Sequence, residues 1–365
     1  MILVTGGTGY LGSLLVPELL ALGYDVRVVD TLWFGNHLDP HPRLQVIRGD
    51  IRYCDDAWLD GVDGVIHLAG ISNDPTADFA PLLNAEVNVL ATRSLAGRLS
   101  AIARREARPI RFVMASSCSI YYTATPEAAF ELHGKTEATL VAPTANYSKT
   151  KRLAEIDLLR LADLNPYFSP VILRKGALFG LAPRMRFDLV INAFTLYAWK
   201  RRLLTVYGRG EAWRPLLHVR DAVDAYLYAL ASPEEQVRGQ VFNILHKNCR
   251  ILELAFWVSE VLEEHRQVSI PVRRDRSVGS GDRSYYVLGE KVRRQMGFQA
   301  ERGATQAILE IWDALEAGQF GCDPQDEPRY FNLRWFKQRN QAGDLAILPG
   351  HQVSLPSVVV VHEIG

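Results

Sequence analysis

The chain has 365 residues, which is enough for one large domain and a smaller one. Its 41 basic and 41 acidic residues cancel, which argues against the basic surface of a nucleic-acid-binding protein. Four cysteines without paired spacing indicate a reducing compartment, and no apolar run reaches the ~20 residues that a membrane helix needs. We therefore expect a cytoplasmic protein with no nucleic-acid partner, no membrane partner and no metal site.

The first 20 residues predict a strand, a glycine-rich turn and a helix. An apolar run at 1–4 precedes Gly6, Gly9 and Gly12, and apolar residues at helical spacing occupy 14–20. In such a turn one glycine permits the tight bend, one lets a diphosphate approach the backbone, and one lets the helix pack against the strand. The helix N-terminus also offers free N–H groups to phosphate. The sequence predicts a dinucleotide site here, and an ordinary glycine-rich turn is the alternative.

Two later strand ends carry acidic residues that suit the adenosine half of a dinucleotide. Asp30 closes an expected strand at 25–30, about 20 residues past the turn, where a carboxylate accepts hydrogen bonds from the ribose hydroxyls. A carboxylate there repels a 2′-phosphate, so NAD is favoured over NADP. Asp50 and Ile51 close a third expected strand at 44–51 and are placed to contact the adenine. A surface aspartate is the alternative for Asp30.

The alternation of strands and helices continues along the first half of the chain. Strands are expected at 64–70 and 110–115, with a long helix at 82–105 between them. This pattern predicts an α/β fold with a Rossmann-type doubly wound parallel sheet, in which ligands bind outside the carboxyl ends of the strands. Ser117 follows one strand and lies where chemistry is expected, unless it belongs to a polar turn. His67, inside an apolar strand, is expected to be a hydrogen-bonded core residue.

A tyrosine and a lysine four residues apart start a further expected helix. Tyr147 and Lys151 share one helical face, and the lysine ammonium lowers the phenol pKa from its usual value near 10. A hydroxyl from Ser117 can hydrogen-bond the substrate alcohol that Tyr147 deprotonates. Such a pair is common by chance, but it gains weight after a dinucleotide turn and a strand-end serine. Ser117, Tyr147 and Lys151 are the expected catalytic residues.

Together these segments resemble the extended short-chain dehydrogenase/reductase family, specifically its NAD-dependent nucleotide-sugar epimerases and dehydratases. The resemblance spans about residues 1–318. It is carried by Gly6-x-x-Gly9-x-x-Gly12, Asp30, 49–51, 67–70, Asn88-Val89, Ser116-Ser117, Tyr147-x-x-x-Lys151, 173–180, 208–221 and 291–298.

The resemblance implies an NAD-binding domain at 1–175, to which segments near 215–245 return, and a smaller C-terminal α/β domain at 176–318. The second domain would bind a nucleotide-diphosphate sugar. Residues 319–365 form an extension of unknown role. A homodimer built through two helices of the first domain is also implied.

The implied ligand contacts fall into two groups. Those to NAD are Gly6, Thr8, Gly9, Tyr10, Leu11, Gly12, Asp30, Asp50, Ile51, Leu68, Ala69, Gly70, Asn88, Tyr147 and Lys151. Those to the substrate are Ser72, Ser119, Asn192, Arg214 and Arg283. Arg214 and Arg283 are candidate clamps, because a guanidinium can donate two parallel hydrogen bonds to phosphate. Surface arginines and a solvated asparagine are the alternatives.

Departures from the family pattern restrict the reaction. Ala177 replaces an asparagine that relatives place on the substrate phosphate, and Cys118 and Ser119 replace the Asp-Glu pair of dehydratases. Relatives that epimerise beside a keto group carry a cysteine at the position of Ser119. These substitutions favour 4-epimerisation through a transient 4-keto sugar, with the hydride returned to the other face. The alternatives are a nucleotide-sugar dehydrogenase or ketoreductase, a 4,6-dehydratase with a non-standard acid and, least favoured, a non-catalytic dinucleotide-binding protein.

Overall fold

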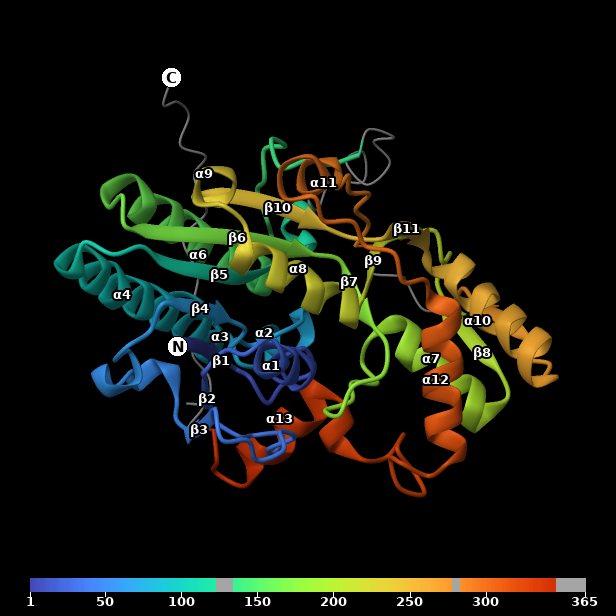
Figure 1. The fold of residues 1–365 in the computed structure, drawn as a ribbon. Coiled ribbons are helices and arrows are strands. Elements are labelled where there is room, and N and C mark those ends of the chain that lie inside the picture. The colour runs from blue at the N-terminus through green and yellow to red at the C-terminus, as the bar shows by residue number, and fades with distance from the viewer. Residues whose placement is uncertain (123–133, 278–282, 346–365) are drawn as a thin grey trace.

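The computed structural model describes residues 1–122, 134–277 and 283–345. At its centre is a seven-stranded sheet in the order β10-β6-β5-β4-β1-β2-β3, and every neighbouring pair is parallel (Figure 1). From β1 the chain adds β2 and β3 toward one edge of the sheet, and from β4 it adds β5, β6 and β10 toward the other edge. The strand order therefore reverses between β1 and β4. The expected doubly wound Rossmann-type sheet is therefore confirmed. The strands are β1 (Ile2–Thr5), β2 (Val26–Asp30), β3 (Leu44–Arg48), β4 (Gly64–His67), β5 (Ile110–Ser117), β6 (Phe168–Lys175) and β10 (Gln240–Ile244).

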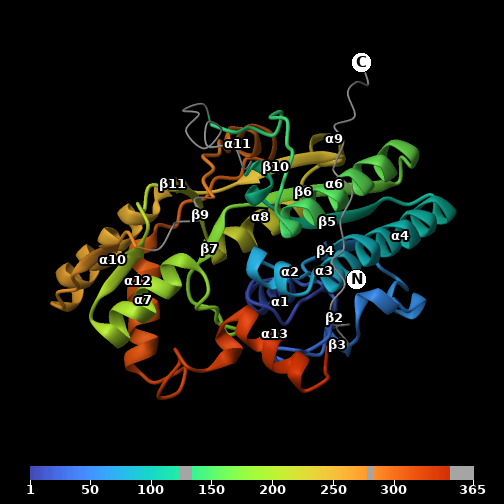
Figure 2. The same ribbon diagram turned by 180° about the vertical axis from the view of Figure 1, so that it is seen from behind.

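Helices cover both faces of this sheet (Figures 1 and 2). The helices α1 (Gly12–Ala21) and α8 (Val219–Ala231) pack on one face, and α4 (Thr92–Glu106) and α6 (Asn146–Leu164) pack on the other. Successive strand residues point to opposite faces, so Val4 joins the first core and Leu3 the second. Both faces are buried, which is why the strands are almost continuously apolar.

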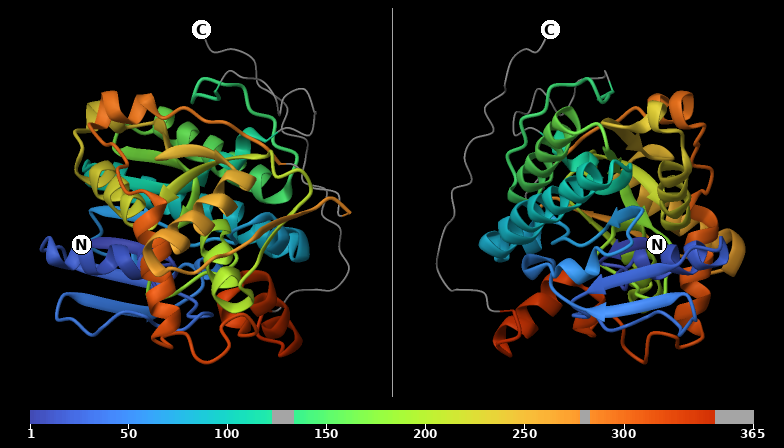
Figure 3. Two further views of the ribbon diagram at one scale, coloured as in Figure 1. Left: turned by 90° about the vertical axis from the view of Figure 1, so that its right-hand side faces the viewer. Right: turned by 60° about the vertical axis from the view of Figure 1, so that its left-hand side comes forward.

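The chain after β6 also builds a smaller part beside the sheet (Figure 3). Its core lies between two small sheets and three helices. The elements are β7 (Ala177–Phe179), β9 (Trp213–His218) and β11 (Lys247–Arg250), the pair β8 (Leu204–Tyr207) and β12 (Val272–Asp275), and α7 (Val190–Arg201), α10 (Ile251–Arg266) and α12 (Ala304–Glu316). The remaining elements are η1 (Ile51–Tyr53), η2 (Asp56–Trp58), α2 (Asp74–Phe79), α3 (Pro81–Ala85), η3 (Glu86–Ala91), η4 (Cys118–Tyr121), α9 (Glu234–Val237), α11 (Glu290–Met296), η5 (Pro328–Tyr330) and α13 (Asn332–Gln341).

Two expected elements differ in detail. The helix expected at 82–105 is interrupted by the π-helical turn η3, where the Asn88 side chain turns to bind the loop after β4. The strand expected at 44–51 ends at Arg48, because the Asp50 carboxylate accepts the Arg52 N–H and caps η1 instead. Among the described residues, no helix is both long and apolar enough to cross a bilayer.

His67 lies in the core, as expected. Its Nδ1 is 2.7 Å from Thr5 Oγ1 and its Nε2 is 2.9 Å from Thr92 Oγ1. Burial lowers the pKa of the imidazole to about 3, so the ring is neutral at physiological pH. The histidine links β4 to its neighbours and takes no part in the cavity described below.

A buried ion pair joins α6 to the middle of the sheet. The Glu155 carboxylate accepts hydrogen bonds from Arg174 Nε at 3.0 Å, Arg174 Nη2 at 2.7 Å and Ser116 Oγ at 2.5 Å. Arg174 Nη1 also donates to Tyr121 Oη at 2.7 Å. Burial disfavours the charge of Glu155, yet the Arg174 guanidinium holds its pKa below the usual range. The pair fixes α6 against β5 and β6.

We predict that Glu155→Gln lowers the free energy of unfolding by ~3–5 kcal/mol, because it leaves the Arg174 charge buried without compensation. The measurement is equilibrium unfolding in urea. Asp157→Asn is the matched control, since Asp157 lies on the same helix in an exposed pair with Arg93 and should cost under about 1 kcal/mol. Equal losses in the two variants would contradict the prediction.

Candidate active site

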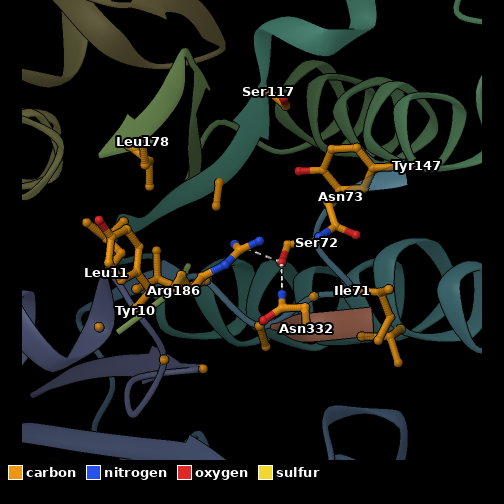
Figure 4. Close-up of a pocket in the computed structure, with 18 of the residues that line it drawn as sticks. Tyr10, Leu11, Ile71, Ser72, Asn73, Ser117, Tyr147, Leu178, Arg186 and Asn332 are labelled. Carbon is orange, nitrogen blue, oxygen red and sulfur yellow. Dashed lines mark hydrogen bonds between the residues drawn. The ribbon is translucent and has the colours of Figure 1, made fainter. Parts of the chain in front are cut away.

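The carboxyl ends of β1, β2, β4 and β5 open into a cavity of about 370 Å³, which the smaller part closes from the other side (Figure 4). This volume is in the range of small-molecule sites. Most residues expected from the sequence line it: Gly6, Gly9, Tyr10, Leu11, Gly12, Asp30, Asp50, Ile51, Leu68, Ala69, Gly70, Ser72, Ser117, Ser119, Tyr147 and Lys151. In the described part of the chain, no group of His, Cys, Asp or Glu side chains could hold a metal ion.

The glycine turn is packed backbone against backbone. A Cβ on Gly6, whose φ is +73°, would lie 2.6 Å from the Ala69 nitrogen, and one on Gly12 would lie 2.5 Å from the Gly7 oxygen. Gly9 differs, because a Cβ there would meet only the Gly6 oxygen, at 3.3 Å. The open space at Gly9 belongs to the cavity, at the start of α1. The turn therefore fits a diphosphate, and with it a dinucleotide.

Asp30 is held in place by the turn that it faces. Its Oδ2 accepts the Thr8 N–H at 3.1 Å, and its Oδ1 accepts the Leu32 N–H at 2.9 Å. Asp50 forms an ion pair with Arg52 at 2.7 Å. Both carboxylates line the cavity, while Thr8 is buried behind it. Thr8 therefore holds Asp30 through its backbone N–H, and its expected ligand contact stays a prediction.

Two asparagines expected at the ligands also lie behind the cavity wall. Asn88 exchanges hydrogen bonds with the backbone of Ile71, with its Oδ1 accepting at 2.9 Å and its Nδ2 donating at 3.0 Å. Asn192 is fully buried, where its Oδ1 accepts the Gly180 N–H and its Nδ2 donates to Tyr10 Oη and a backbone carbonyl. Both the oxygen and the nitrogen of each amide are therefore hydrogen-bonded within the chain. Asn88 and Asn192 thus hold neighbouring segments in place, and their expected ligand contacts stay predictions.

Ser117, Tyr147 and Lys151 converge on one end of the cavity. Tyr147 directs its hydroxyl inward, near Ser117 at the end of β5 (Figure 4). Lys151 Nζ lies 5.9 Å from the centre of the Tyr147 ring, and burial lowers the pKa of this amine to about 8. Burial and the Asp74 charge raise the pKa of the Tyr147 phenol, whereas a hydrogen bond with Ser117 and the Arg186 charge lower it. Arg186 thus acts on the phenol as Lys151 was expected to.

The residues after Ser117 alternate in direction. Cys118 is fully buried away from the cavity, and its Sγ donates to the Arg174 carbonyl at 3.1 Å. Burial raises the pKa of this thiol. Ser119 lines the cavity and accepts a hydrogen bond from Ser148 Oγ at 3.0 Å. The strand end therefore presents hydroxyl groups and no thiol, as the alternation predicts.

Arg214 and Arg283 lie together in a smaller pocket of about 100 Å³, which shares Asp74, Ser119 and Tyr285 with the main cavity. Arg283 forms an ion pair with Asp74, and Arg214 donates to the Arg283 carbonyl. Burial raises the pKa of Asp74, and Arg283 acts against that rise. The two expected clamps are thus adjacent to each other, beside the reacting end of the cavity.

Several cavity residues were not anticipated from the sequence. They are Trp33, Phe34, Lys175, Arg184, Arg186, Tyr285, Asn332 and Phe336. Arg184 and Arg186 are two residues apart, so in an extended segment their side chains would point to the same side. This spacing is only a weak sequence signal for a ligand site. Asn332 and Phe336 lie beyond the family resemblance, and nothing in their local sequence points to a ligand.

Comparisons with known proteins agree with a dinucleotide-binding enzyme fold. A family model described as "NAD dependent epimerase/dehydratase family" matches residues 2–244. UDP-glucuronic acid decarboxylase 1 of Xenopus tropicalis is 28% identical over 63% of this chain, and the chain spans only 53% of that relative's length. UDP-glucose 4-epimerase of Caenorhabditis elegans is 25% identical over 86% of this chain and 96% of its own.

Solved structures share the fold. MoeE5 in complex with UDP-glucuronic acid and NAD superposes with a TM-score of 0.72 at 25% identity, covering 87% of this chain and 99% of its own. The UDP-glucuronic acid 4-epimerase from Bacillus cereus, solved with UDP-glucuronic acid and NAD, has a TM-score of 0.71 at 22% identity and the same coverage.

Replacement by alanine should have different effects at two glycines of the turn. Gly9→Ala should fold normally but bind NAD⁺ at least ~100-fold more weakly, because the methyl group occupies the space for the ligand. Gly12→Ala should lose stability, because its Cβ would overlap the Gly7 backbone. Thermal unfolding and titration calorimetry separate the two effects. Full binding by Gly9→Ala would contradict the assignment of the turn.

The buried lysines predict that the ligand-free protein becomes more stable as the pH rises from about 7 to about 10. Burial lowers the pKa of Lys175 to about 7 and that of Lys151 to about 8, whereas lysines in an unfolded chain titrate near 10.4. The unfolded chain then binds more protons in this interval, so stability increases, by up to about 1.4 kcal/mol per pH unit per lysine. Above about pH 10 the tyrosines of the unfolded chain ionise first and end the rise.

Urea unfolding at about pH 7.5 and about pH 9.5 measures this slope. Lys175→Met should roughly halve it, and Lys200→Met, at an exposed ion pair on α7, should leave it unchanged. A stability that is flat or falling over the interval would show that the two amines are charged in the folded protein.

Proposed function

The chain belongs to the NAD dependent epimerase/dehydratase family, and we propose that it interconverts a nucleotide-diphosphate sugar and its 4-epimer through a transient 4-keto sugar. One observation carries the proposal. Tyr147, Ser117 and Lys151 meet at one end of a cavity whose other end is formed by the glycine turn and Asp30, while Cys118 faces away. The strand end thus presents groups for hydride chemistry and lacks the acid pair or inward cysteine of other reactions.

NAD, when bound, supplies a reversible acceptor for the hydride of the sugar C4–H bond. The chain's own residues bind and orient it. The N–H groups of the glycine turn and the positive end of α1 suit its diphosphate. Asp30 can accept hydrogen bonds from the ribose hydroxyls, and Asp50 and Ile51 line the cavity where the adenine would lie.

Tyr147 acts as the base for the sugar hydroxyl. Burial opposes its ionisation, so the phenolate needs nearby cations. The Arg186 charge lowers the pKa of the phenol, and Lys151 Nζ lies 5.9 Å from the ring centre. Ser117 holds the substrate oxygen by a hydrogen bond as its proton moves to Tyr147 Oη. The same phenol returns the proton after the ketone has presented its other face.

The substrate diphosphate suits the adjoining pocket. Arg214 and Arg283 lie there side by side, and guanidinium groups bind phosphate oxygens in pairs. The relatives that are named for UDP-sugars make a UDP-sugar the first substrate to test. Ala177 also lines the main cavity, where its methyl group cannot reproduce an amide contact to phosphate. The arginines would then carry more of the phosphate binding than in relatives with asparagine.

The test is incubation of the NAD-loaded protein with a panel of UDP-, dTDP-, GDP- and CDP-sugars. We expect one epimer pair to equilibrate with no net reduced cofactor, and Tyr147→Phe to lower the rate by at least ~100-fold. Tyr207→Phe is the matched control, because Tyr207 is exposed on β8, and it should keep full activity. Stoichiometric NADH turnover would establish a net oxidoreductase instead, and failure to convert any sugar would remove the proposal.

A second candidate reaction, elimination, is favoured by Asp74. This carboxylate lines both pockets, and its Oδ1 is buried without a hydrogen-bond partner. Burial raises its pKa, which suits an acid that transfers a proton. Elimination would give a keto product lighter by one water, and Asp74→Asn should abolish it. A product of unchanged mass would exclude this candidate.

A further inference from the structure

The segment that follows α12 returns to the nucleotide-binding half of the molecule. Its aromatic residues pack on Phe187, whose ring centre is 5.2 Å from that of Phe320 and 5.6 Å from that of Tyr330. The segment then forms η5 and α13, and α13 lies against α2 and the loop that follows β2 (Figure 1). We call residues 328–345 the C-terminal clasp. Two of its residues, Asn332 and Phe336, form part of the cavity wall.

Asn332 joins three segments that are distant in sequence. Its Nδ2 donates to Ser72 Oγ at 2.8 Å, in the loop after β4, and its Oδ1 accepts from Arg184 Nη2 at 2.6 Å. Its backbone N–H donates to Asp188 Oδ2 at 3.3 Å. Figure 4 shows Asn332 and Arg186 reaching Ser72 from different sides. Because Asn332 is buried, this junction ties the clasp to both halves of the cavity.

The clasp also covers the loop that follows Asp30. The rings of Phe336 and Trp33 meet edge to face, with their centres 5.3 Å apart, and Trp335 Nε1 donates to the Trp33 carbonyl at 2.6 Å. Trp33, Phe34 and Phe336 line the cavity. The clasp therefore closes the cavity next to the carboxylate that suits the adenosine ribose.

Arg184 is a buried cation of this region without an ion pair among the described residues. It is 4% exposed, its guanidinium carbon lies 3.8 Å from the centre of the Phe34 ring, and it lines the cavity. Its Nε is buried without a hydrogen-bond partner. The charges of Asp188 and Asp30 oppose the fall in its pKa that burial causes, but neither carboxylate forms an ion pair with it among the described residues. A buried guanidinium without an ion-pair partner is unfavourable. Its position in the cavity wall points to an anionic ligand.

We propose that Arg184, held by Asn332, binds the diphosphate oxygens of the dinucleotide, and that the C-terminal clasp retains the dinucleotide through successive turnovers. The proposal rests on the proposed function, because it takes NAD as the ligand. The anion is the diphosphate, since Asp30 at the same end of the cavity repels a 2′-phosphate. A retained dinucleotide suits a reaction that returns its hydride in every turnover.

The first experiment measures how fast bound NAD⁺ leaves. The full-length protein is loaded with NAD⁺ and chased with fluorescent 1,N6-etheno-NAD⁺. Arg184→Gln and Phe336→Ala should exchange ~10- to 100-fold faster than the wild type, as expected for the loss of a charge-assisted contact or of the covering ring. Gln338→Ala, on the exposed face of α13, should exchange at the wild-type rate.

The outcomes separate the two proposals. A wild type that binds no NAD⁺ overturns both the proposed function and the clasp. A wild type that binds NAD⁺, with Arg184→Gln and Phe336→Ala exchanging at its rate, overturns the clasp alone. Near-ultraviolet circular dichroism shows which variants are folded. Should Phe336→Ala unfold, Arg184→Gln decides the matter, because it removes the charge and keeps an unbranched polar side chain at this position.

The second experiment identifies the group that Arg184 contacts. ADP and adenosine each compete with etheno-NAD⁺ for the site. In Arg184→Gln, competition by ADP should weaken ~10- to 100-fold, while competition by adenosine should stay within about twofold of the wild type. An equal loss for both ligands would show that Arg184 acts on the adenosine and would overturn its assignment to the diphosphate.

Discussion

The buried pair of Glu155 and Arg174 determines where the reacting groups lie. Ser116 donates to the same carboxylate, so the residue before Ser117 is tied directly to the helix that carries Tyr147 and Lys151. Lys151 is one helical turn before Glu155, on the same face of α6. A single carboxylate therefore sets the spacing between the strand-end hydroxyl and the phenol.

A second constraint is the close approach of the loop after β4 to the same helix. A Cβ on Gly70 would lie 2.8 Å from Asn88 Oδ1 and 3.1 Å from Lys151 Nζ, so a larger residue there would displace the Asn88 amide. The Asn88 amide then holds the backbone of Ile71, which carries the chain on to Ser72. The π-helical turn at Asn88 and the glycine act together. They bring Ser72 to the place where Arg186 and Asn332 reach it.

The sequence predicts those parts of the site that depend on short-range spacing. The glycine turn, Asp30 and the Tyr147–Lys151 pair each lie within one strand, turn or helix, so their geometry follows from local structure. Asn88 and Asn192 were expected at the ligands because spacing cannot show that their amides are bound to the backbone of other segments. Arg184 and Asn332 were missed because they are 148 residues apart. Only the folded chain shows that this arginine has no ion pair among the described residues and that the extension reaches it.

The charged side chains that line the cavity bear both on how the cofactor is retained and on how Tyr147 ionises during the reaction. Among the acidic residues of the cavity, Asp50 is paired with Arg52, Asp74 with Arg283, and Asp30 is held by backbone N–H groups. The buried cations are less well compensated: burial lowers the pKa of Lys175 to about 7 and that of Arg184 to about 9. A bound diphosphate supplies negative charge at one end, and a phenolate on Tyr147 supplies it at the other. The same excess of positive charge therefore favours an anionic ligand at rest and the ionised base during the reaction.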